Sequence, residues 1–526
     1  MRLRRRRLLL LMAGSASVLA AACSTQPVPS AAPAKPADPA KPTESKPAAP
    51  AAPGAATSAP AAAKPADPAK PAADAKPAAP AATATPVVEA KTSAAVSGGN
   101  VVKVVAWTIG PDAPSFYRRD NLVAAAETLN KELEGQRSQD RVQVEASFES
   151  GGGWADFKQK FTLAAEAKQG PDIVLAGHED LAPWSSAGYI VELDPLLKKY
   201  EQQFADVYPT LWPSVQYRGK TYAIPQDTEA RPMYYRRDLL AKLGWPKEMI
   251  DGLPDAVRKG EWAMPDLVET AKEAVSKGVV ESGKGWYHRP TRGHDHYMFY
   301  YQNGGEMQDK ESGKLVLVRD ALEKHFQLHF DAVKTHKITP ENFLGSDFRQ
   351  WHETVTAGKV MFYNAGTWTW AEWQKVYKVP EQQQWDDVGF MLIPSAARGG
   401  KPVTLSHPLV YMVTAGSKNQ ELAFRLLAHA TTPALNSKHS VESAHLAILK
   451  TQEQDPTYQK DKFLLATGYM SEYTTFIPNH PKYGSYDEVL FRLLSAVQAG
   501  QMPPKQAADV AVDELKAQLK DDVITR

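Results

Sequence analysis

Cysteine is almost absent from this chain, since Cys23 is the only one among 526 residues. A single cysteine cannot form an internal disulfide, so no disulfide framework supports the fold. Long apolar runs are also scarce. The stretch from Leu8 to Leu19 is shorter than the roughly 20 residues that a membrane-spanning helix needs. Basic and acidic residues nearly balance, at 61 and 60, so no strong charge of one sign is expected.

The known phosphate-binding glycine motifs are missing as well. Gly151–Gly153 follow a predicted strand, but the lysine of a GxxxxGK[ST] motif and the spacing of GxGxxG are both absent. These glycines therefore do not indicate a nucleotide site.

The N-terminal 22 residues have the pattern of a secretory signal. Arg2 and Arg4–Arg7 precede the apolar stretch, and Ala20–Ala22 stand directly before Cys23. This position resembles a bacterial lipobox, in which the cysteine is lipidated and becomes the new N-terminus. The resemblance implies a signal peptide over 1–22 and a lipid on Cys23 at the extracytoplasmic face of the bacterial cytoplasmic membrane. An ordinary cleavage site with an incidental cysteine is the alternative, and the arginines leave Sec and Tat export both open.

Loss of this signal changes the net charge. Without its five arginines, 56 basic residues stand against 60 acidic residues, a formal charge of −4. A mildly acidic protein repels nucleic-acid phosphates, so we expect no nucleic-acid partner.

Residues 23–100 are rich in alanine, proline and lysine and repeat phrases such as PAKPADPAKP. Proline at this density favours polyproline II and removes amide donors, which predicts a disordered, semi-stiff linker. The remaining residues, 101–526, are too many for a single hydrophobic core. Two lobes are therefore expected.

The folded region begins with a repeated order of strand, loop and helix. This order predicts an α/β fold with parallel sheets, which bind ligands beyond the carboxyl ends of their strands. The predicted strands are Val101–Trp107, Val142–Phe148 and Ile173–Leu175, and the predicted helices are Arg119–Leu133 and Trp154–Lys168. The candidate ligand contacts at these strand ends and loops are Trp107, Asp112, Ser150, His178 and Glu179.

A dense polar segment follows a predicted hairpin at Arg218-Gly219-Lys220. Burying its side chains without partners would be costly, so they face water, each other or a ligand. Asp227 and Glu229 could in principle act as the two carboxylates of a glycoside hydrolase. Acceptance of ligand hydroxyls is the simpler interpretation, so we predict no catalytic residue and take Asp227, Glu229 and Arg231 as ligand contacts.

Three stretches resemble one known family. Tyr222–Pro225 and Tyr234–Leu240 are similar to the segment that crosses between two lobes in the family 1 extracellular solute-binding proteins, the maltose-binding-like receptors of ABC importers. Gly170–Val174 resembles the family's third strand, whose loop carries a sugar-contacting acid, here Glu179. Val360–Trp370 resembles a strand that ends in glycine before a sugar-stacking tryptophan. These two residues are Gly366 and Trp368 here.

The resemblance implies a type II periplasmic-binding-protein-like fold. Each lobe would be a doubly wound sheet flanked by helices, with the ligand in a cleft between the lobes. Lobe 1 would comprise about 101–226 and 408–450, and lobe 2 about 230–405 and 465–526. The family also implies contacts from a second crossing at His407 and from aromatic residues before a late helix, Tyr483 and Tyr486.

The implied function is capture of a sugar or oligosaccharide by closure of the two lobes, followed by delivery to permease subunits with a separate ATPase. We expect a monomer that needs no cofactor. His294-Asp295-His296 invites a metal site, but rings two residues apart on a helix point away from each other, so no metal is predicted. A receptor for another polar solute, such as a glycerol phosphate or a peptide, remains open, and a carbohydrate-active surface enzyme is a further alternative.

Overall fold

The computed structural model describes residues 87–111, 113–151 and 153–526. Cys23, the predicted signal peptide, most of the predicted linker and the candidate Asp112 lie outside these residues. Among the described residues, no helix combines the length and the apolar composition that a membrane crossing requires.

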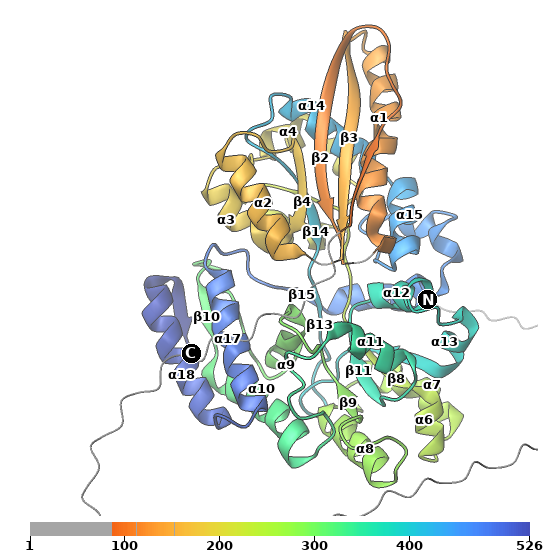
Figure 1. Cartoon of the computed structure of the whole chain (residues 1–526), viewed down its shortest axis with the longest axis vertical. Helices are drawn as coiled ribbons and strands as arrows, with labels where there is room; N and C mark the ends of the chain where they lie inside the picture. The colour runs from red at the N-terminus through yellow and green to blue at the C-terminus, as the bar shows by residue number, and fades with distance from the viewer. Residues whose placement is uncertain (1–86, 112, 152) are drawn as a thin grey trace, which may run out of the picture. The chain divides into compact units, whose positions relative to one another are not determined.

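A six-stranded sheet forms the centre of lobe 1, with the strand order β1-β3-β2-β4-β14-β7. The strands β3, β2 and β4 run parallel, as the sequence predicts, and the others are antiparallel to their neighbours. Figure 1 shows helices on both sides of this sheet, with α1 on one side and α2 on the other. The strands are β1 (Val87–Thr92), β2 (Asn100–Ile109), β3 (Asp140–Ser150), β4 (Ile173–Gly177), β7 (Ile224–Pro225) and β14 (Leu409–Val413). The helices are α1 (Tyr117–Gly135), α2 (Trp154–Glu166), α3 (Leu181–Ser186), α4 (Asp194–Lys199), α5 (Glu201–Phe204), α14 (Gln420–Ala430) and α15 (Pro433–Ser443).

The apolar periodicity explains these elements. Val142, Val144 and Ala146 of β3 are fully buried, while the residues between them are half-buried. This period of two is that of a strand with one face against a core. The predicted helices at Arg119–Leu133 and Trp154–Lys168 are confirmed as α1 and α2.

The folded region begins earlier than residue 101, where the sequence analysis placed it. Strand β1 lies inside the predicted linker and pairs antiparallel with β3, from Val87 opposite Ser150 to Thr92 opposite Glu145. The composition changes at this point and explains the strand. Pro86 is the last proline of the proline-rich segment, and the β-branched pair Val87-Val88, which favours a strand, follows it. The edge of the lobe 1 sheet is therefore covered by a strand from the linker.

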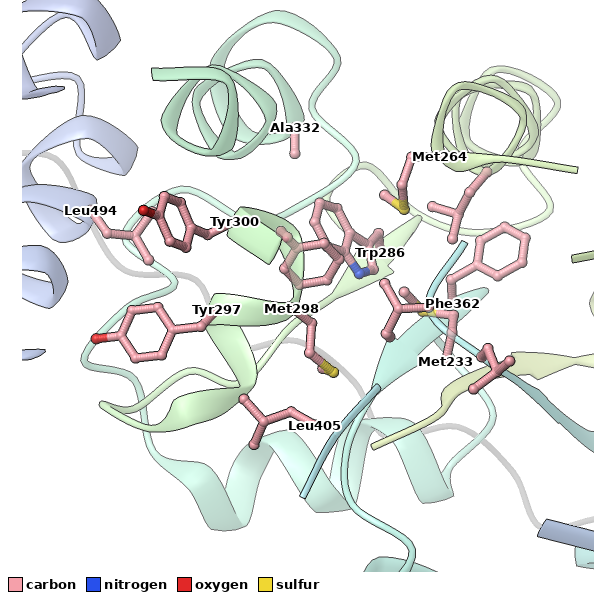
Figure 2. Packing of buried hydrophobic residues seen from close by; sticks show 14 of the residues in the cluster. Met233, Met264, Trp286, Tyr297, Met298, Tyr300, Ala332, Phe362, Leu405 and Leu494 are labelled. Atoms are coloured by element: carbon pink, nitrogen blue, oxygen red, sulfur yellow. The ribbon is translucent and has the colours of Figure 1, made fainter. Parts of the chain in front are cut away.

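A four-stranded sheet with the order β12-β8-β11-β9 forms the centre of lobe 2. Figure 2 shows part of its core, in which Trp286 lies amid Met264, Met298 and Phe362. The strands of this sheet are β8 (Met233–Arg236), β9 (Trp286–Tyr287), β11 (Phe362–Asn364) and β12 (Val388–Met391). The helices are α6 (Arg237–Lys242), α7 (Lys247–Arg258), α8 (Met264–Ser276), α9 (Met298–Tyr301), α10 (Arg319–Phe330), α11 (Phe348–Thr356), α12 (Trp368–Lys375), α13 (Glu381–Asp387), α16 (Lys462–Thr467), α17 (Tyr483–Gln498) and α18 (Pro504–Leu519). Short two-stranded pairs complete the fold, namely β5 (Gln216–Tyr217) with β6 (Lys220–Thr221), β10 (Leu315–Leu317) with β16 (Val523–Thr525), and β13 (Thr404–Ser406) with β15 (Thr474–Phe476).

The chain passes between the lobes several times. The first crossing runs from β7 to β8, and the second joins β13 to β14 through His407 and Pro408. A third passes through Leu446, whose backbone bridges to Thr228 of the first crossing. These adjacent segments join the two cores. They also carry several of the polar residues described below.

Lobe 2 buries a row of four histidines. His325, His329, His288 and His296 stand ring against ring, with centroids 4.8, 4.8 and 5.3 Å apart in that order. Gln498 of α17 lies 2.7 Å from His288 Nε2 and 3.0 Å from His329 Nδ1. Burial lowers the pKa of His325 to about 3 and holds the pKa values of His288 and His329 well below their usual range. These three rings are therefore neutral at pH 7.

We expect acid to destabilise the protein before its exposed carboxylates titrate. Below about pH 6.5 the unfolded chain gains protons on these histidines, whereas the folded chain does not. The free energy of unfolding should therefore fall with pH, by up to about 1.4 kcal/mol per pH unit for each histidine. Calorimetric melting from pH 7.5 to pH 5 measures this slope. His325→Gln removes one of the histidines, so it should reduce the slope by the contribution of one histidine, up to about 1.4 kcal/mol per pH unit. An equal slope in parent and variant would contradict the expectation.

Candidate functional site

Glu179 lies where β4 ends and the short turn η2 (His178–Asp180) begins. Its Oε2 lies 2.5 Å from His407 Nε2, and its Oε1 accepts a hydrogen bond from Lys158 Nζ at 2.7 Å. Burial opposes the charge, but His407 and Lys158 outweigh it, so the pKa of Glu179 stays well below its usual range. The adjacent Asp180 also contacts Lys158, and burial raises its pKa to about 7. Glu179 is thus an ionised carboxylate that joins lobe 1 to the second crossing.

The first crossing carries a buried network of charges. Glu229 Oε1 accepts a hydrogen bond from the backbone N–H of His407 at 2.7 Å and forms an ion pair with Arg231 Nη1 at 3.0 Å. Arg231 Nε donates to Asp295 Oδ1 of lobe 2 at 3.1 Å. Burial raises the pKa of Glu229, with Arg231 and His407 acting against it. The three charged side chains are at most 5% exposed, so each depends on the others for solvation.

Trp368 is the first residue of α12, directly after the turn that follows β11. Its ring lies over Gly366, where an added Cβ would collide with the indole, so only glycine fits there. The Arg231 guanidinium stands 5.2 Å from the centre of the Trp368 ring, and the His445 ring is stacked at 6.2 Å. Trp368 is half-buried. An aromatic face and charged hydrogen-bonding groups therefore meet between the lobes.

His178 is fully buried beside His407, with ring centroids 5.4 Å apart. Its Nδ1 lies 2.7 Å from Oδ1 of Asn479, whose amide nitrogen donates to the carbonyl oxygens of Ser214 and Gln216. Asn479 Oδ1 is therefore an acceptor, and His178 carries its proton on Nδ1. Its Nε2 is an unprotonated nitrogen, buried without a hydrogen-bond partner among the described residues.

Tyr483 and Tyr486 both belong to α17 but have different surroundings. The Tyr483 hydroxyl lies 2.9 Å from His294 Nδ1, which connects it to the polar network, because the His294 ring lies 4.7 Å from that of His407. Tyr486 is fully buried and donates to the carbonyl oxygen of Val316 at 2.7 Å. The structure therefore gives Tyr486 a place in the lobe 2 core.

Asp227 differs from the other acids of the crossing. Its Oδ2 lies 2.5 Å from Arg118 Nη2 and 3.2 Å from His439 Nε2, and its Oδ1 accepts from the backbone N–H of Leu409 at 2.9 Å. Asp227 and Arg118 are each 1% exposed. Burial opposes ionisation, but the guanidinium and the nearby His445 hold the pKa of Asp227 far below its usual range. Asp227 thus joins α1 of lobe 1 to the crossing.

The remaining candidates have other neighbours. Trp107 is half-buried on β2, with Lys160 Nζ 4.7 Å from its ring centre, and Ser150 ends β3 opposite Val87. The network itself combines the predicted residues His178, Glu179, Glu229, Arg231, Gly366, Trp368, His407 and Tyr483.

Sequence reasoning missed several partners of the predicted residues. Lys158 lies on an amphipathic helix, where a lysine is ordinary, and Arg118 is one of two adjacent arginines at the start of α1. Asn479 follows a proline in a loop and carries no motif. His294 belongs to the HxH pattern of the sequence, and the ring of His296 lies among the histidines of lobe 2.

A cavity of about 1260 Å³ lies away from this network. Its wall combines the β5–β6 hairpin of lobe 1, the loop 305–314 of lobe 2 and the segment Thr474–His480. None of the predicted contacts among the described residues lines it. Two of its lining residues hydrogen-bond predicted contacts, since Asn479 lies 2.7 Å from His178 Nδ1 and the carbonyl oxygen of His480 accepts from the backbone N–H of Tyr483. Parallel sheets bind ligands beyond the carboxyl ends of their strands, and this cavity is not formed by those loops. We therefore take the network around Trp368 and Glu229 as the candidate site.

Comparisons with known proteins agree with this fold. A galactooligosaccharide-binding protein of Bacillus subtilis is 21% identical over 364 residues, which cover 67% of this chain and 78% of that protein. The cyclic alpha-maltosyl-1,6-maltose binding protein of Arthrobacter globiformis superposes with a TM-score of 0.63 at 17% identity, over 80% of this chain and all of that chain. The maltose/maltodextrin-binding domain MalE of Bdellovibrio bacteriovorus, bound to maltotriose, gives a TM-score of 0.60 at 21% identity, over 80% of this chain and 100% of the other.

These similarities confirm the predicted α/β fold with two lobes. The family described as bacterial extracellular solute-binding protein matches residues 120–436, which is more than half of the chain. Its members are binding proteins. The chain belongs to the bacterial extracellular solute-binding protein family.

Proposed function

We propose that this protein captures a sugar or an oligosaccharide outside the cytoplasm by closing its two lobes, and delivers it to an ABC importer. The observation that carries the proposal is the meeting of a half-buried indole, Trp368, with Arg231 and Glu229 at the junction of the lobes. Family membership and the oligosaccharide-binding relatives support it.

A pyranose suits this combination of groups. The axial C–H face of the ring is apolar and packs on an indole, while its rim of hydroxyls needs hydrogen-bond donors and acceptors. Trp368 offers the face, Glu229 and Glu179 offer acceptors, and Arg231 offers donors. Because Glu179 belongs to lobe 1 and Trp368 to lobe 2, a solute that contacts both stabilises the closed form.

The rest of the transport system follows from the proposal. The solute passes to permease subunits whose ATPase is a separate chain, and the receptor acts as a monomer. The predicted lipid on Cys23 would tether the receptor at the extracytoplasmic face of the membrane, and the proline-rich linker would let the folded lobes reach the permease.

A screen of saccharides tests the proposal. Maltooligosaccharides, galactooligosaccharides, glycerol phosphates and peptides are added to the purified protein, and the melting temperature is measured. A true ligand at one hundred times its dissociation constant should raise the free energy of unfolding by about 2.7 kcal/mol. A response to a glycerol phosphate or a peptide alone would favour a receptor for another polar solute. Release of shorter sugars from an oligosaccharide, followed by chromatography, would indicate a surface enzyme instead.

Replacement of the predicted lipidation residue should release the protein from membranes. Cys23→Ser removes the thiol that lipidation requires. Because Cys23 precedes the predicted linker, we expect the variant to melt at the same temperature as the parent. Fractionation of cells and melting of the purified variant measure both effects. Continued membrane association of Cys23→Ser would rule out the lipid anchor.

A further inference from the structure

Two places in the described part of the chain bring three metal-ligating side chains to within 4.8 Å of one another. One consists of Asp227, His439 and His445, and the other of Glu179, His294 and His407. The two groups differ in the cation that already neutralises their carboxylate, Asp227 in the first and Glu179 in the second. This difference decides which group suits a metal ion.

The first group already contains a cation. Arg118 Nη2 lies 2.5 Å from Asp227 Oδ2 and 3.3 Å from His445 Nε2. All these side chains are buried, so a metal ion would have to share a closed space with a guanidinium. We therefore assign no metal to this group.

The second group is only partly buried. The side chains of Glu179 and His407 are 13% and 15% exposed, and Lys158 engages only Oε1 of the carboxylate, which leaves Oε2 facing His407 Nε2. Nδ1 of His294 is engaged by Tyr483, so its Nε2 is the nitrogen available to a ligand. The ring of His294 lies 4.7 Å from that of His407.

The surroundings of this group resemble those of metal-binding histidines. A ligating imidazole commonly donates its second N–H to an oxygen that fixes its orientation. Tyr483 supplies such an oxygen to His294. His178 next to His407 is held in the same way by Asn479, and its Nε2 is buried without a partner among the described residues. A bare nitrogen of this kind adds a further lone pair on the ring next to His407.

We propose that Glu179, His294 and His407 form a binding site for a zinc-like divalent cation that bridges the two lobes. Two imidazoles and one carboxylate favour zinc over magnesium or calcium, which prefer oxygen ligands. Three protein ligands leave a fourth position for water or a solute atom. Glu179 comes from lobe 1, His294 from lobe 2 and His407 from the second crossing, so the bound cation holds the lobes closed. The metal site shares Glu179 with the proposed saccharide site, but zinc binding can be measured without a saccharide.

Calorimetric titration with zinc chloride alone tests the proposal on the purified protein after treatment with a chelator. We expect one zinc ion per chain, with a dissociation constant on the order of 1 µM or tighter, and no binding of magnesium or calcium. Glu179→Gln and His294→Gln should each weaken binding by more than about 100-fold. Tyr483→Phe, which keeps the ring but removes the oxygen next to His294, should weaken it by about 10- to 100-fold.

The chain offers a matched control in another pair of histidine and glutamate. His429 Nε2 lies 2.5 Å from Glu132 Oε2, but its third neighbour is Arg425 instead of a second histidine. His429→Gln should leave zinc affinity unchanged. The proposal is overturned if the parent binds no zinc, or if folded Glu179→Gln and His294→Gln variants bind it as tightly as the parent. Loss of binding in His429→Gln would also overturn it, since that result places the ion elsewhere.

Discussion

Asp227→Asn should destabilise the empty protein by about 3–5 kcal/mol, because it leaves the Arg118 guanidinium charged and unpaired in a buried site. The substitution keeps the shape of the side chain and removes its charge, so the loss reports on the ion pair. The sequence analysis takes Asp227 as a ligand contact. The burial of both partners at 1% exposure gives Asp227 a structural role in the empty protein.

A double-mutant cycle makes this prediction specific. Arg118→Met should cost a similar amount, whereas Asp227→Asn combined with Arg118→Met should cost less than the sum of the two, because no isolated charge remains. Chemical denaturation measures all four proteins. Glu127→Gln, which removes an exposed ion pair with Lys131 on the same helix α1, should leave the melting temperature unchanged. Parent-like stability of Asp227→Asn would show that the buried pair contributes little.

The architecture of lobe 1 was predictable because it depends on local patterns. The alternation of Val142, Val144 and Ala146 defines a strand, and an amphipathic helix follows each of the first two strands of the parallel set. The same holds for the strand ends, so the position of Glu179 directly after β4 could be predicted from the sequence. Strand β1 escaped prediction because a short β-branched run next to a proline-rich segment is a weak signal.

The partners of the charged groups were not predictable in the same way. Arg118 and Asp227 lie 109 residues apart, and Glu179 and His407 lie 228 residues apart. A single sequence records which residues carry charge but not which of them the fold brings together. The sequence analysis predicts that the side chains of the polar crossing face water, a ligand or each other. In the structure, Glu229 and Arg231 face each other and form an ion pair. Tertiary packing decides which acidic side chains pair with a neighbouring residue and which stay available to bind a solute.

Trp368→Ala should weaken binding of the best saccharide by about 30- to 1,000-fold, equivalent to roughly 2–4 kcal/mol. The indole offers the sugar an apolar face, and its position over Gly366 and beside Arg231 fixes the orientation of that face. Truncation removes the apolar contact and the shape constraint together. Because Trp368 is half-buried while Trp370 and Trp373 belong to the core, the fold should survive its loss. Isothermal titration calorimetry measures the affinity, and a melting curve checks the fold.

Tyr217→Ala is the matched control, because this aromatic residue lines the cavity of about 1260 Å³ instead of the candidate site. If the sugar packs on Trp368, removal of Tyr217 should leave the affinity within about threefold of the parent value, or about 0.7 kcal/mol. The opposite pattern, in which Tyr217→Ala weakens binding and a folded Trp368→Ala does not, would move the saccharide to the cavity. Trp368 would then be a packing residue, and the ligand would contact the β5–β6 hairpin and the loop 305–314.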